Sequence, residues 1–482
     1  MKIIIGLGTT GLSCAKYLVH KNIDFIMMDS RENPPNLVEF KKLCPEKKIY
    51  LGEINQKIIQ QFSEIILSPG VSPDIFPAEK TISDIELFAR EAKAPIIGIT
   101  GTNAKGTVTT WLGEMIEASG LTVALGGNIG TPALDLLSQK TPDFYVLELS
   151  SFQLEITHRL YLKSAVILNL SPDHLDRHKT MENYQKAKQR IYHHTETAVF
   201  NRDDAYTYPA GAEHPLFQRG STPKASGGFF TLLLGKIPRL LRSLPPLKKG
   251  AFPGLTRNTQ VRSCLSFGLD KPKDNQFGLD QNHLAYGKKL LLPVSDLKIQ
   301  GRHNYANALA ALALGHSIGL SLENMITALK KFPGLPHRCE WVAAENHINW
   351  INDSKGTNIG AAIAALDGIG KSLNGKIILI AGGMGKNADF ALLQDAVKNY
   401  TRVIILIGRD AKLISNAISP SIHNHHIKFA STLKEAVLAA KLSALPGDAV
   451  LLSPACASFD MFQDFEDRGN QFKHLVKDLL HT

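Results

Sequence analysis

A lysine in a loop of small residues is the feature of this sequence with the clearest chemistry. Residues 98–110 read Gly-Ile-Thr-Gly-Thr-Asn-Ala-Lys-Gly-Thr-Val-Thr-Thr, directly after a short apolar run. From Val108 to Ile116 apolar side chains recur with helical spacing, which predicts a strand, a loop and then a helix. Backbone N–H groups at such a helix start attract phosphate, and Lys105 adds a full positive charge. The loop is therefore predicted to bind ATP.

Two positions of this loop depart from the phosphate-loop pattern G-x-x-x-x-G-K-[ST]. Ala104 stands where the pattern has its second glycine, and Gly106 stands where it has the hydroxyl that binds magnesium. The first glycine is also displaced, since Gly98 comes one residue early. Alanine at position 104 costs roughly 1–2 kcal/mol if its backbone is left-handed. Thr107 is the nearest hydroxyl that can replace the missing magnesium ligand.

A second glycine-rich turn opens the chain. The strand Ile3–Ile5 runs into Gly-Leu-Gly-Thr-Thr-Gly at 6–11, and Asp29 ends the next predicted strand. This spacing is typical of a turn that holds a diphosphate, which makes a dinucleotide-binding oxidoreductase one alternative. Close packing of strand against helix is another. Ser68-Pro69-Gly70 follows the predicted strand 65–67 and is expected at the same edge of the sheet.

Polar residues also follow the strands after the lysine loop. Glu148 interrupts an apolar strand, and because a buried carboxylate is costly without a cation, magnesium is its predicted partner. The strand 165–170 leads into Asp173, His174 and Asp176, which suit either a metal or catalytic site or a solvated loop. Lys188 lies in the predicted helix 181–192, and the pattern alone assigns it to the surface.

Further polar clusters occur in the second half of the chain. Asn304 and Asn307 share one helical face and suit either an adenine or phosphate contact or a helix cap. Asp-Ser-Lys-Gly-Thr-Asn at 353–358 follows a predicted strand and places Lys355 where it can bind an anion. Lys386 and the segment 453–458 follow two more apolar strands.

Composition indicates a globular α/β protein. The 482 residues are 44% hydrophobic and 20% charged, and strands alternate with helices, which favours parallel sheets covered by helices. No run of about 18 apolar residues occurs, so no membrane span is expected. Met1-Lys2 leads directly into a strand, which predicts no signal peptide and a cytoplasmic location. The five cysteines are scattered without C-x-x-C spacing, so they are expected to be reduced thiols. A monomer is expected.

The positive charge is concentrated in one stretch. The net charge is +10, but residues 206–262 alone hold nine Lys or Arg against one acid, Glu213. Nucleic-acid binding is therefore not expected. This stretch is rich in Pro, Gly and Leu and lacks sustained periodicity, so residues from about 209 to 260 are interpreted as an insertion, with a basic binding arm as the alternative. Lengthening a surface loop costs only about 0.6 kcal/mol per doubling.

Taken in order, these motifs resemble the Mur ligases of bacterial cell-wall synthesis. Nine blocks carry the resemblance: GLGTTGLS at 6–13, GGNIGTPAL at 126–134, YVLELSSFQLE at 145–155, DHLDRH at 173–178, KAKQRIY at 186–192, GRHNYANALAALAL at 301–314, GLPHRCE at 334–340, WINDSKGTN at 350–358 and LLSPACASFDMF at 451–462. The resemblance implies three domains. They are an N-terminal Rossmann-like domain at 1–93, a central P-loop ATPase-like α/β domain at 94–334 and a C-terminal Rossmann-like domain at 335–482.

The same resemblance implies an activity. Members of the family bind a UDP-sugar, ATP and an amino acid on the three domains in turn. For this chain it implies ATP-dependent ligation of D-glutamate to UDP-N-acetylmuramoyl-L-alanine through an acyl phosphate, in peptidoglycan precursor synthesis, with two Mg²⁺ ions. Because Ala104 and Gly106 depart from the family loop, a weakly active or inactive copy that still binds UDP-sugar is the alternative within this class.

Site residues follow from the resemblance position by position. For the UDP-sugar it implies Thr9, Thr10, Asp29, Ser30, Arg31, Ser68, Gly70 and Asn128. For ATP it implies Gly101, Thr102, Asn103, Ala104, Lys105, Gly106, Thr107, Asn304, Asn307, Arg338 and Asp353. For magnesium it implies Glu148, His174 and Lys188, the last after carbamylation, and Thr107 joins them as the substitute hydroxyl. For D-glutamate it implies Lys355, Thr357, Lys386, Ser458 and Phe465. Lys105, His174 and Lys188 are the expected catalytic residues.

Overall fold

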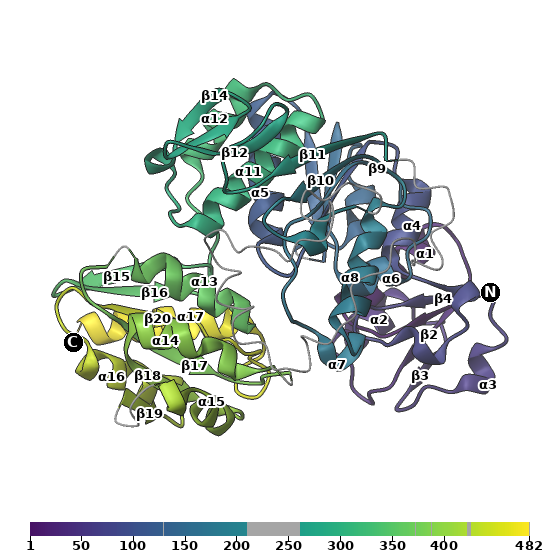
Figure 1. Cartoon of the computed structure of the whole chain (residues 1–482). Helices are drawn as coiled ribbons and strands as arrows, with labels where there is room; N and C mark the ends of the chain where they lie inside the picture. The colour runs from purple at the N-terminus through teal and green to yellow at the C-terminus, as the bar shows by residue number, and fades with distance from the viewer. Residues whose placement is uncertain (129, 210–260, 372, 387, 422–425, 482) are drawn as a thin grey trace, which may run out of the picture. The chain divides into compact units, whose positions relative to one another are not determined.

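The chain forms three β-sheets, each covered by helices, in the predicted α/β arrangement (Figure 1). The computed structural model describes all residues except 129, 210–260, 372, 387, 422–425 and 482. The chain divides into two compact units. The first comprises Met1–Pro209 and Thr259–Pro333 and holds two of the sheets, and the described part of the second begins at Gly334 and holds the third.

The first sheet has five parallel strands in the order β3-β2-β1-β4-β5. Its strands are β1 (Lys2–Ile5), β2 (Phe25–Asp29), β3 (Ile49–Leu51), β4 (Glu64–Leu67) and β5 (Thr81–Ile82), and its helices are α1 (Thr9–His20), α2 (Leu37–Leu43), α3 (Gln56–Ile59) and α4 (Asp84–Glu91). Alternate residues of β1 face opposite sides, since Ile4 joins one buried cluster and Ile3 and Ile5 join another. A Cβ on Gly11 would lie 1.9 Å from the Gly6 carbonyl oxygen, so α1 can pack this closely on the turn only with glycine there.

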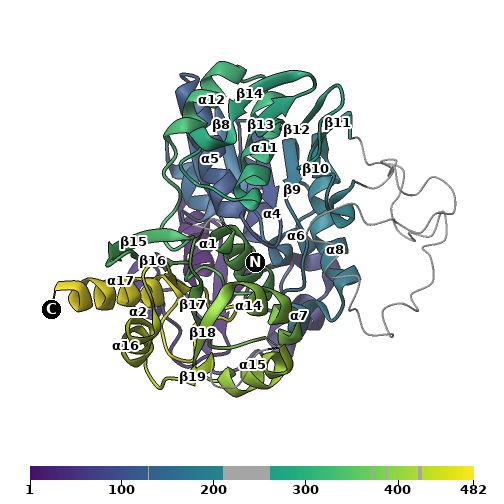
Figure 2. The same cartoon turned by 60° about the vertical axis from the view of Figure 1, so that its left-hand side comes forward.

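The second sheet has nine strands in the order β14-β13-β12-β11-β10-β9-β6-β8-β7, parallel from β7 to β12 and antiparallel beyond. The strands are β6 (Ile96–Thr100), β7 (Val123–Gly127), β8 (Phe144–Glu148), β9 (Leu162–Ile167), β10 (Thr195–Asn201), β11 (Ser263–Phe267), β12 (Gln276–Asp280), β13 (His283–Tyr286) and β14 (Lys289–Pro293). The helices are α5 (Lys105–Ala118), α6 (Ser151–Glu155), α7 (Leu175–His178), α8 (Met181–Gln189), α11 (Arg302–Ser317) and α12 (Leu322–Lys331). Figures 1 and 2 both show α11 and α12 beside α5.

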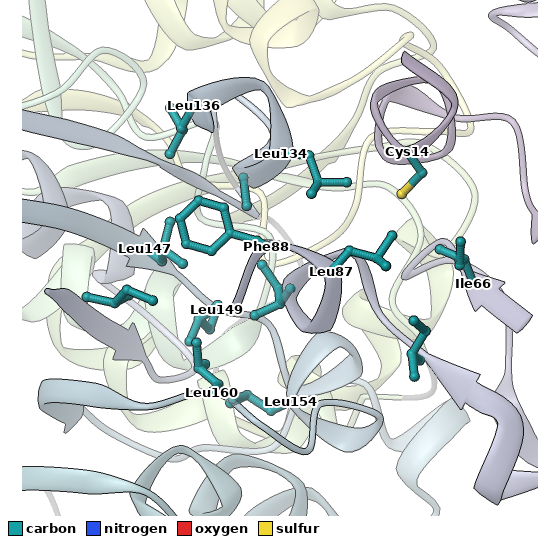
Figure 3. Packing of buried hydrophobic residues seen from close by; sticks show 14 of the residues in the cluster. Cys14, Ile66, Leu87, Phe88, Leu134, Leu136, Leu147, Leu149, Leu154 and Leu160 are labelled. Carbon is teal, nitrogen blue, oxygen red and sulfur yellow. The ribbon is translucent and has the colours of Figure 1, made fainter. Parts of the chain in front are cut away.

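The first two sheets share one hydrophobic core. Leu87 and Phe88 of α4 pack between Cys14 and Ile66 on one side and the leucines of the second sheet on the other (Figure 3). The Phe88 ring meets the Tyr145 ring edge-on, with centroids 5.0 Å apart. These contacts tie the predicted N-terminal and central domains into one unit, and the boundary at residue 93 remains a prediction.

The second unit is a six-stranded sheet in the order β15-β16-β20-β17-β18-β19. Its strands are β15 (Glu340–Glu345), β16 (Ile348–Asn352), β17 (Ile377–Gly382), β18 (Thr401–Ile407), β19 (Ile427–Phe429) and β20 (Ala449–Leu452), and its helices are α13 (Ile359–Gly370), α14 (Gln394–Tyr400), α15 (Ala411–Ile418), α16 (Leu433–Ser443) and α17 (Phe465–His481). Along β17, Ile377 and Leu379 face α13–α15, whereas Ile378 and Ile380 face α16 and α17. Only a sheet covered on both faces gives such a continuous apolar strand.

The interpreted insertion lies outside the described residues apart from its first residue, Pro209. The elements that flank it, β10 and β11, are adjacent parallel strands with Thr197 opposite Ser263. A crossover between parallel strands needs only about a dozen residues. Among the helices of the described chain, none combines the length and apolar character that crossing a bilayer requires.

Candidate functional site

The lysine loop lies at the point where the second sheet reverses its strand order. β6 leads into the loop, and β8 and β9 pair with β6 on its two sides. The carboxyl ends of these three strands therefore lie together, which is where open α/β sheets bind ligands. The loop, Glu148 and the segment after β9 are thus brought to one edge, as the sequence predicts.

Lys105 folds back over its own loop. It is the first residue of α5, and its Nζ donates hydrogen bonds to the carbonyl oxygens of Gly101 at 3.0 Å and Thr102 at 3.1 Å. Gly106 and Thr107 are buried in the first turn of the same helix. The ammonium group is held at the helix start, where the dipole favours an anion, so it is placed for a phosphate.

Ala104 has the left-handed backbone conformation that makes alanine at this position of the loop unfavourable. Its φ is 67° and its ψ is 1°, in the left-handed region. We expect Ala104→Gly to raise the free energy of unfolding by about 1 kcal/mol, because the left-handed cost exceeds the entropy that glycine loses. Chemical denaturation of the two proteins measures this.

Ala118→Gly, at the far end of α5, is the matched control for that change. Ala118 has an ordinary helical place and is exposed, so glycine there should destabilise the protein. Equal effects at both positions would show that the left-handed backbone at 104 is not strained.

The segment after β9 is hydrogen-bonded to the phosphate loop. The Thr102 amide donates to the Asn169 carbonyl at 2.9 Å, and the Asn103 amide donates to Asn169 Oδ1 at the same distance. Thr102 Oγ1 also lies 3.2 Å from the hydroxyl of Tyr184 on α8. Sequence reasoning gave Asn169 and Tyr184 no role. The only indication for Asn169 in the sequence is that a polar residue follows a predicted strand. Nothing in the sequence indicates a role for Tyr184.

Glu148 ends β8 with a carboxylate that suits a cation. The residue is 3% exposed, its Oε1 accepts a hydrogen bond from Asn128 Nδ2 at 3.0 Å, and its Oε2 is buried and accepts none among the described residues. A buried carboxylate oxygen without a hydrogen bond is costly unless it meets a cation, and Mg²⁺ prefers such oxygen ligands. Asn128, predicted to contact the UDP-sugar, is placed against this carboxylate.

No group of three His, Cys, Asp or Glu residues that could hold a metal occurs in the part of the chain that the structure describes. Mg²⁺ often takes only one or two carboxylates from a protein and completes its coordination with water and phosphate oxygens. His174 is the N-cap residue before α7, with a φ of 54°, and its Nε2 lies 3.6 Å from Asp173 Oδ2. Asp176, the third member of the predicted cluster, is exposed.

Lys188 is buried, so its assignment to the surface from the pattern alone is wrong. It is 2% exposed, its Nζ donates to Thr100 Oγ1 at 3.1 Å, and it lies 4.9 Å from the Tyr184 ring centre. Burial, aided by the charge of Lys105, holds the pKa of Lys188 well below its ordinary value. Helix periodicity could not show this, because α8 turns Lys188 toward the end of β6.

The turn at the N-terminal sheet is tied together through Asp29. Asp29 Oδ2 accepts the Leu7 amide at 2.6 Å and Arg31 Nη2 at 2.7 Å, and Oδ1 accepts Arg31 Nε at 2.9 Å. Despite its burial, these bonds lower the pKa of the Asp29 carboxyl. Ser68 Oγ donates to the Gly6 carbonyl at 2.7 Å, which joins the second predicted loop to the first. Thr9, Ser30 and Gly70 lie exposed at the same edge, with Thr10 half-buried.

Asn304 and Asn307 meet as the helical spacing predicts. Asn307 Nδ2 donates to Asn304 Oδ1 at 3.3 Å, and Asn304 Nδ2 donates to the Gln300 carbonyl at 2.9 Å. The bond from Asn304 to Gln300 contacts the turn before α11, which agrees with the alternative that Asn304 caps this helix. Whether the pair also contacts a nucleotide stays a prediction.

In the second unit, the loop after β16 gathers several predicted residues. Asp353 is buried, accepts Cys339 N at 3.1 Å and Ser453 Oγ at 2.7 Å, and burial raises its pKa to about 6. Lys355 Nζ lies 3.5 Å from the centre of the Phe465 ring. Arg338 and Thr357 are half-buried in this unit.

Lys386 and Ser458 flank a second contact in this unit. Met384 and Ala457 pair as an isolated β-bridge, and both predicted residues lie within two positions of it. Lys386 has a φ of 51°. The bridge thus joins the segments that follow β17 and β20, which are neighbouring strands of the sheet.

Arg468 stabilises this region, and the sequence analysis did not identify it. It is fully buried and donates from Nε to Ser354 Oγ at 2.9 Å, from Nη2 to the Ser354 carbonyl at 2.8 Å and from Nη1 to the Cys456 carbonyl at 3.2 Å. Burial lowers its pKa to about 10. It therefore fixes the Lys355 loop to the 453–458 segment.

A lysine-bearing phosphate loop on the parallel strands of a sheet, with a buried carboxylate beside it, defines a nucleotide-binding α/β protein. Three family descriptions match the chain: the MurD-like N-terminal domain of Mur ligases at residues 1–84, the Mur ligase middle domain at 99–215 and the Mur ligase glutamate ligase domain at 337–456. The chain belongs to the Mur ligase family.

Relatives match along the whole length. The chain is 45% identical to the UDP-N-acetylmuramoylalanine--D-glutamate ligase of Legionella pneumophila (strain Paris), over 99% of both chains. It is 43% identical to the protein of that name from Pseudomonas fluorescens (strain Pf0-1), over 99% of this chain and 98% of the relative. The fold is also that of UDP-N-acetylmuramate-alanine ligase from Thermotoga maritima, with a TM-score of 0.59 at 17% identity over 99% of each chain. A pseudomurein peptide ligase from Methanothermus fervidus gives a TM-score of 0.57 at 18% identity, again over 99% of each chain.

Proposed function

We propose that this protein joins D-glutamate to UDP-N-acetylmuramoyl-L-alanine at the expense of ATP, in the synthesis of peptidoglycan precursors. The observation that carries the proposal is the placement of Lys105, Glu148 and Lys188 around one loop, in a chain similar along its length to ligases of that name. We propose a cytoplasmic location. We propose a monomer.

The reaction has two steps. First, a carboxylate oxygen of the alanyl group attacks the γ-phosphorus of ATP, the bond to the β-phosphate oxygen breaks, and ADP leaves. The amine of D-glutamate then attacks the acyl carbon, phosphate leaves with the C–O bond electrons, and the nitrogen loses a proton. Lys105 places positive charge beside the transferring group, where preorganised charge lowers the barrier.

Magnesium is expected next to this lysine. Glu148 would hold it with its unsatisfied Oε2, joined by His174 and by the Thr107 hydroxyl in place of the one lost at Gly106. When bound, the ion neutralises phosphate charge. We propose a second ion on a carbamylated Lys188.

The chemistry of Lys188 supports that modification. A neutral amine can attack carbon dioxide, forming an N–C bond and losing a proton to give a carbamate. The lowered pKa of Lys188 supplies the neutral amine. The product is an anion, which a buried site tolerates beside cations.

The remaining predicted residues are proposed as substrate sites. Those at the edge of the first sheet would hold the UDP-sugar. Lys355, Thr357, Lys386, Ser458 and Phe465 would hold D-glutamate, with Lys355 meeting a carboxylate. Asn304 and Asn307 in the first unit, and Arg338 and Asp353 in the second, are each proposed as ATP-binding residues. The boundaries 1–93, 94–334 and 335–482 are proposed as the three domains.

The dinucleotide-binding oxidoreductase has less support. In dinucleotide sites an acidic residue after the second strand accepts a hydrogen bond from the ribose. Asp29 occupies that place, but both its oxygens already accept hydrogen bonds from Leu7 and Arg31. No other feature of the described chain points to a nicotinamide.

The decisive experiment is ADP formation by the purified protein with Mg²⁺. The proposal expects ADP only when UDP-N-acetylmuramoyl-L-alanine and D-glutamate are both present. ADP formation without D-glutamate, or with L-glutamate equally well, would contradict it.

A weakly active copy is the second candidate, and the left-handed Ala104 beside Gly106 favours it. We expect Ala104→Gly combined with Gly106→Ser to restore the family loop. A rise in phosphate release of tenfold or more would identify a weakened loop. Unchanged release from an active wild-type protein would show that Thr107 or water already replaces the lost ligand.

A further inference from the structure

His174 and two residues of the one-turn helix α7 that follows it pack against one aromatic ring. The amides of Arg177 and His178 both donate to the His174 carbonyl, at 3.1 and 3.0 Å. All three side chains contact Phe152 of α6: the ring centroids of His174 and His178 lie 5.0 and 5.4 Å from it, and the Arg177 guanidinium carbon lies 4.1 Å from it. The position of His174 is thus coupled by packing to that of Arg177.

The guanidinium of Arg177 reaches from this turn to the N-terminal sheet. Its Nη1 donates to the Pro69 carbonyl at 2.7 Å, and its Nη2 lies 3.4 Å from Glu155 Oε2. The side chain is only 14% exposed, and its Nε is buried with no hydrogen bond among the described residues. A charged donor in such a site forms a strong bond with a defined direction.

Pro69 belongs to a loop that is itself anchored. The Val71 amide donates to the Ser68 carbonyl at 2.9 Å, and Ser68 Oγ donates to the Gly6 carbonyl of the glycine-rich turn at 2.7 Å. A continuous set of contacts therefore runs from that turn through Pro69 and Arg177 to His174. Every member lies within the first compact unit.

We propose that Arg177 is a positioning residue, which fixes the distance between the 68–70 loop and His174. The inference rests on the proposed function, in which the first site holds the nucleotide sugar and the second lies beside magnesium. A substrate with its uridine at one site and its reacting carboxylate at the other needs that distance held constant. Arg177 acts through the loop and through Phe152, not on the reacting atoms.

Hydrogen exchange tests the link without any substrate. Arg177→Met keeps an apolar stem against Phe152 and removes the donors to Pro69. We expect faster amide exchange in peptides covering 68–71 and 173–178 together, with exchange in β6 unchanged. Faster exchange across the whole first unit would mean general destabilisation and would overturn the proposal.

Kinetics test its consequence for ligation. We expect Arg177→Met to lower kcat/KM for UDP-N-acetylmuramoyl-L-alanine on the order of tenfold or more, and to leave KM for D-glutamate within twofold. Arg177→Lys retains one cationic donor and should recover part of the loss. Arg159→Met, an exposed arginine of the same unit, is the matched control and should match the wild type.

The two kinds of failure can be told apart. If the wild type forms no ADP but the exchange result holds, the ligase proposal fails and the link stands. If the wild type is active and Arg177→Met changes neither exchange nor the kinetics for the nucleotide sugar, the link is wrong. Equal losses for both substrates would also overturn it, since they would indicate a general structural role.

Discussion

Lys105→Ala is expected to lower kcat for ligation on the order of 10²- to 10³-fold. The side chain is the cation at the start of α5, and removing one preorganised charge from a transferring phosphoryl group has effects of this size. Steady-state ADP formation with saturating substrates measures it. The loss should appear in kcat, because the interaction strengthens as charge develops in the transition state.

A control is needed because Lys105 also bonds its own loop. Its hydrogen bonds to the Gly101 and Thr102 carbonyls would be lost together with its charge. Lys105→Met would lose these hydrogen bonds as well, so it cannot serve as the control. A thermal melt of Lys105→Ala must therefore show that the variant still folds. Lys186→Ala removes an exposed lysine that pairs with Glu182 on α8 and should leave kcat unchanged. Near-normal turnover in Lys105→Ala would remove this lysine from the mechanism.

The elements around this lysine could be predicted because their patterns are local. The apolar run before the loop and the helical spacing after it define β6 and α5 without reference to the rest of the chain. Glu148 was recognisable since a carboxylate in an apolar strand requires a partner. Strand order then places its end beside the loop, as parallel sheets require.

Other features depend on contacts between distant segments and were not predictable. The φ of Ala104 is set by the path from β6 into α5, and the loop pattern indicates only the condition under which alanine is strained. The bond from Arg177 to Pro69 joins residues 108 positions apart. Nothing in the sequence of α4 itself shows that Phe88 lies in the core that two sheets share.

The burial of Lys188 is the clearest feature that the sequence did not predict, and it has the largest expected effect on activity. We expect Lys188→Met to abolish measurable ligation while making the folded protein more stable. Methionine fills the site without a polar group, so the desolvation penalty of the amine disappears, whereas the proposed carbamate can no longer form. A catalytic loss with a stability gain is opposite to what a misfolded variant shows.

The pH dependence of stability gives an independent check in buffer free of carbon dioxide. The unfolded chain protonates Lys188 below about pH 10.4, whereas the folded chain keeps it neutral down to a pKa well below that. Between these two values the unfolded state binds more protons, so the unfolding free energy of the wild type rises with pH. That rise should be smaller in Lys188→Met, and equal slopes would show that the lysine is charged in the folded protein.

Labelled carbon dioxide then tests the modification itself. With ¹³CO₂ the wild type should give a carbamate resonance that Lys188→Met lacks and that Lys186→Ala retains. Because carbamate formation consumes a neutral amine, its extent should fall as pH drops through the lowered pKa of Lys188. An active wild type with no such resonance would mean that the buried lysine serves as a neutral amine, and that the second magnesium site has to be sought elsewhere.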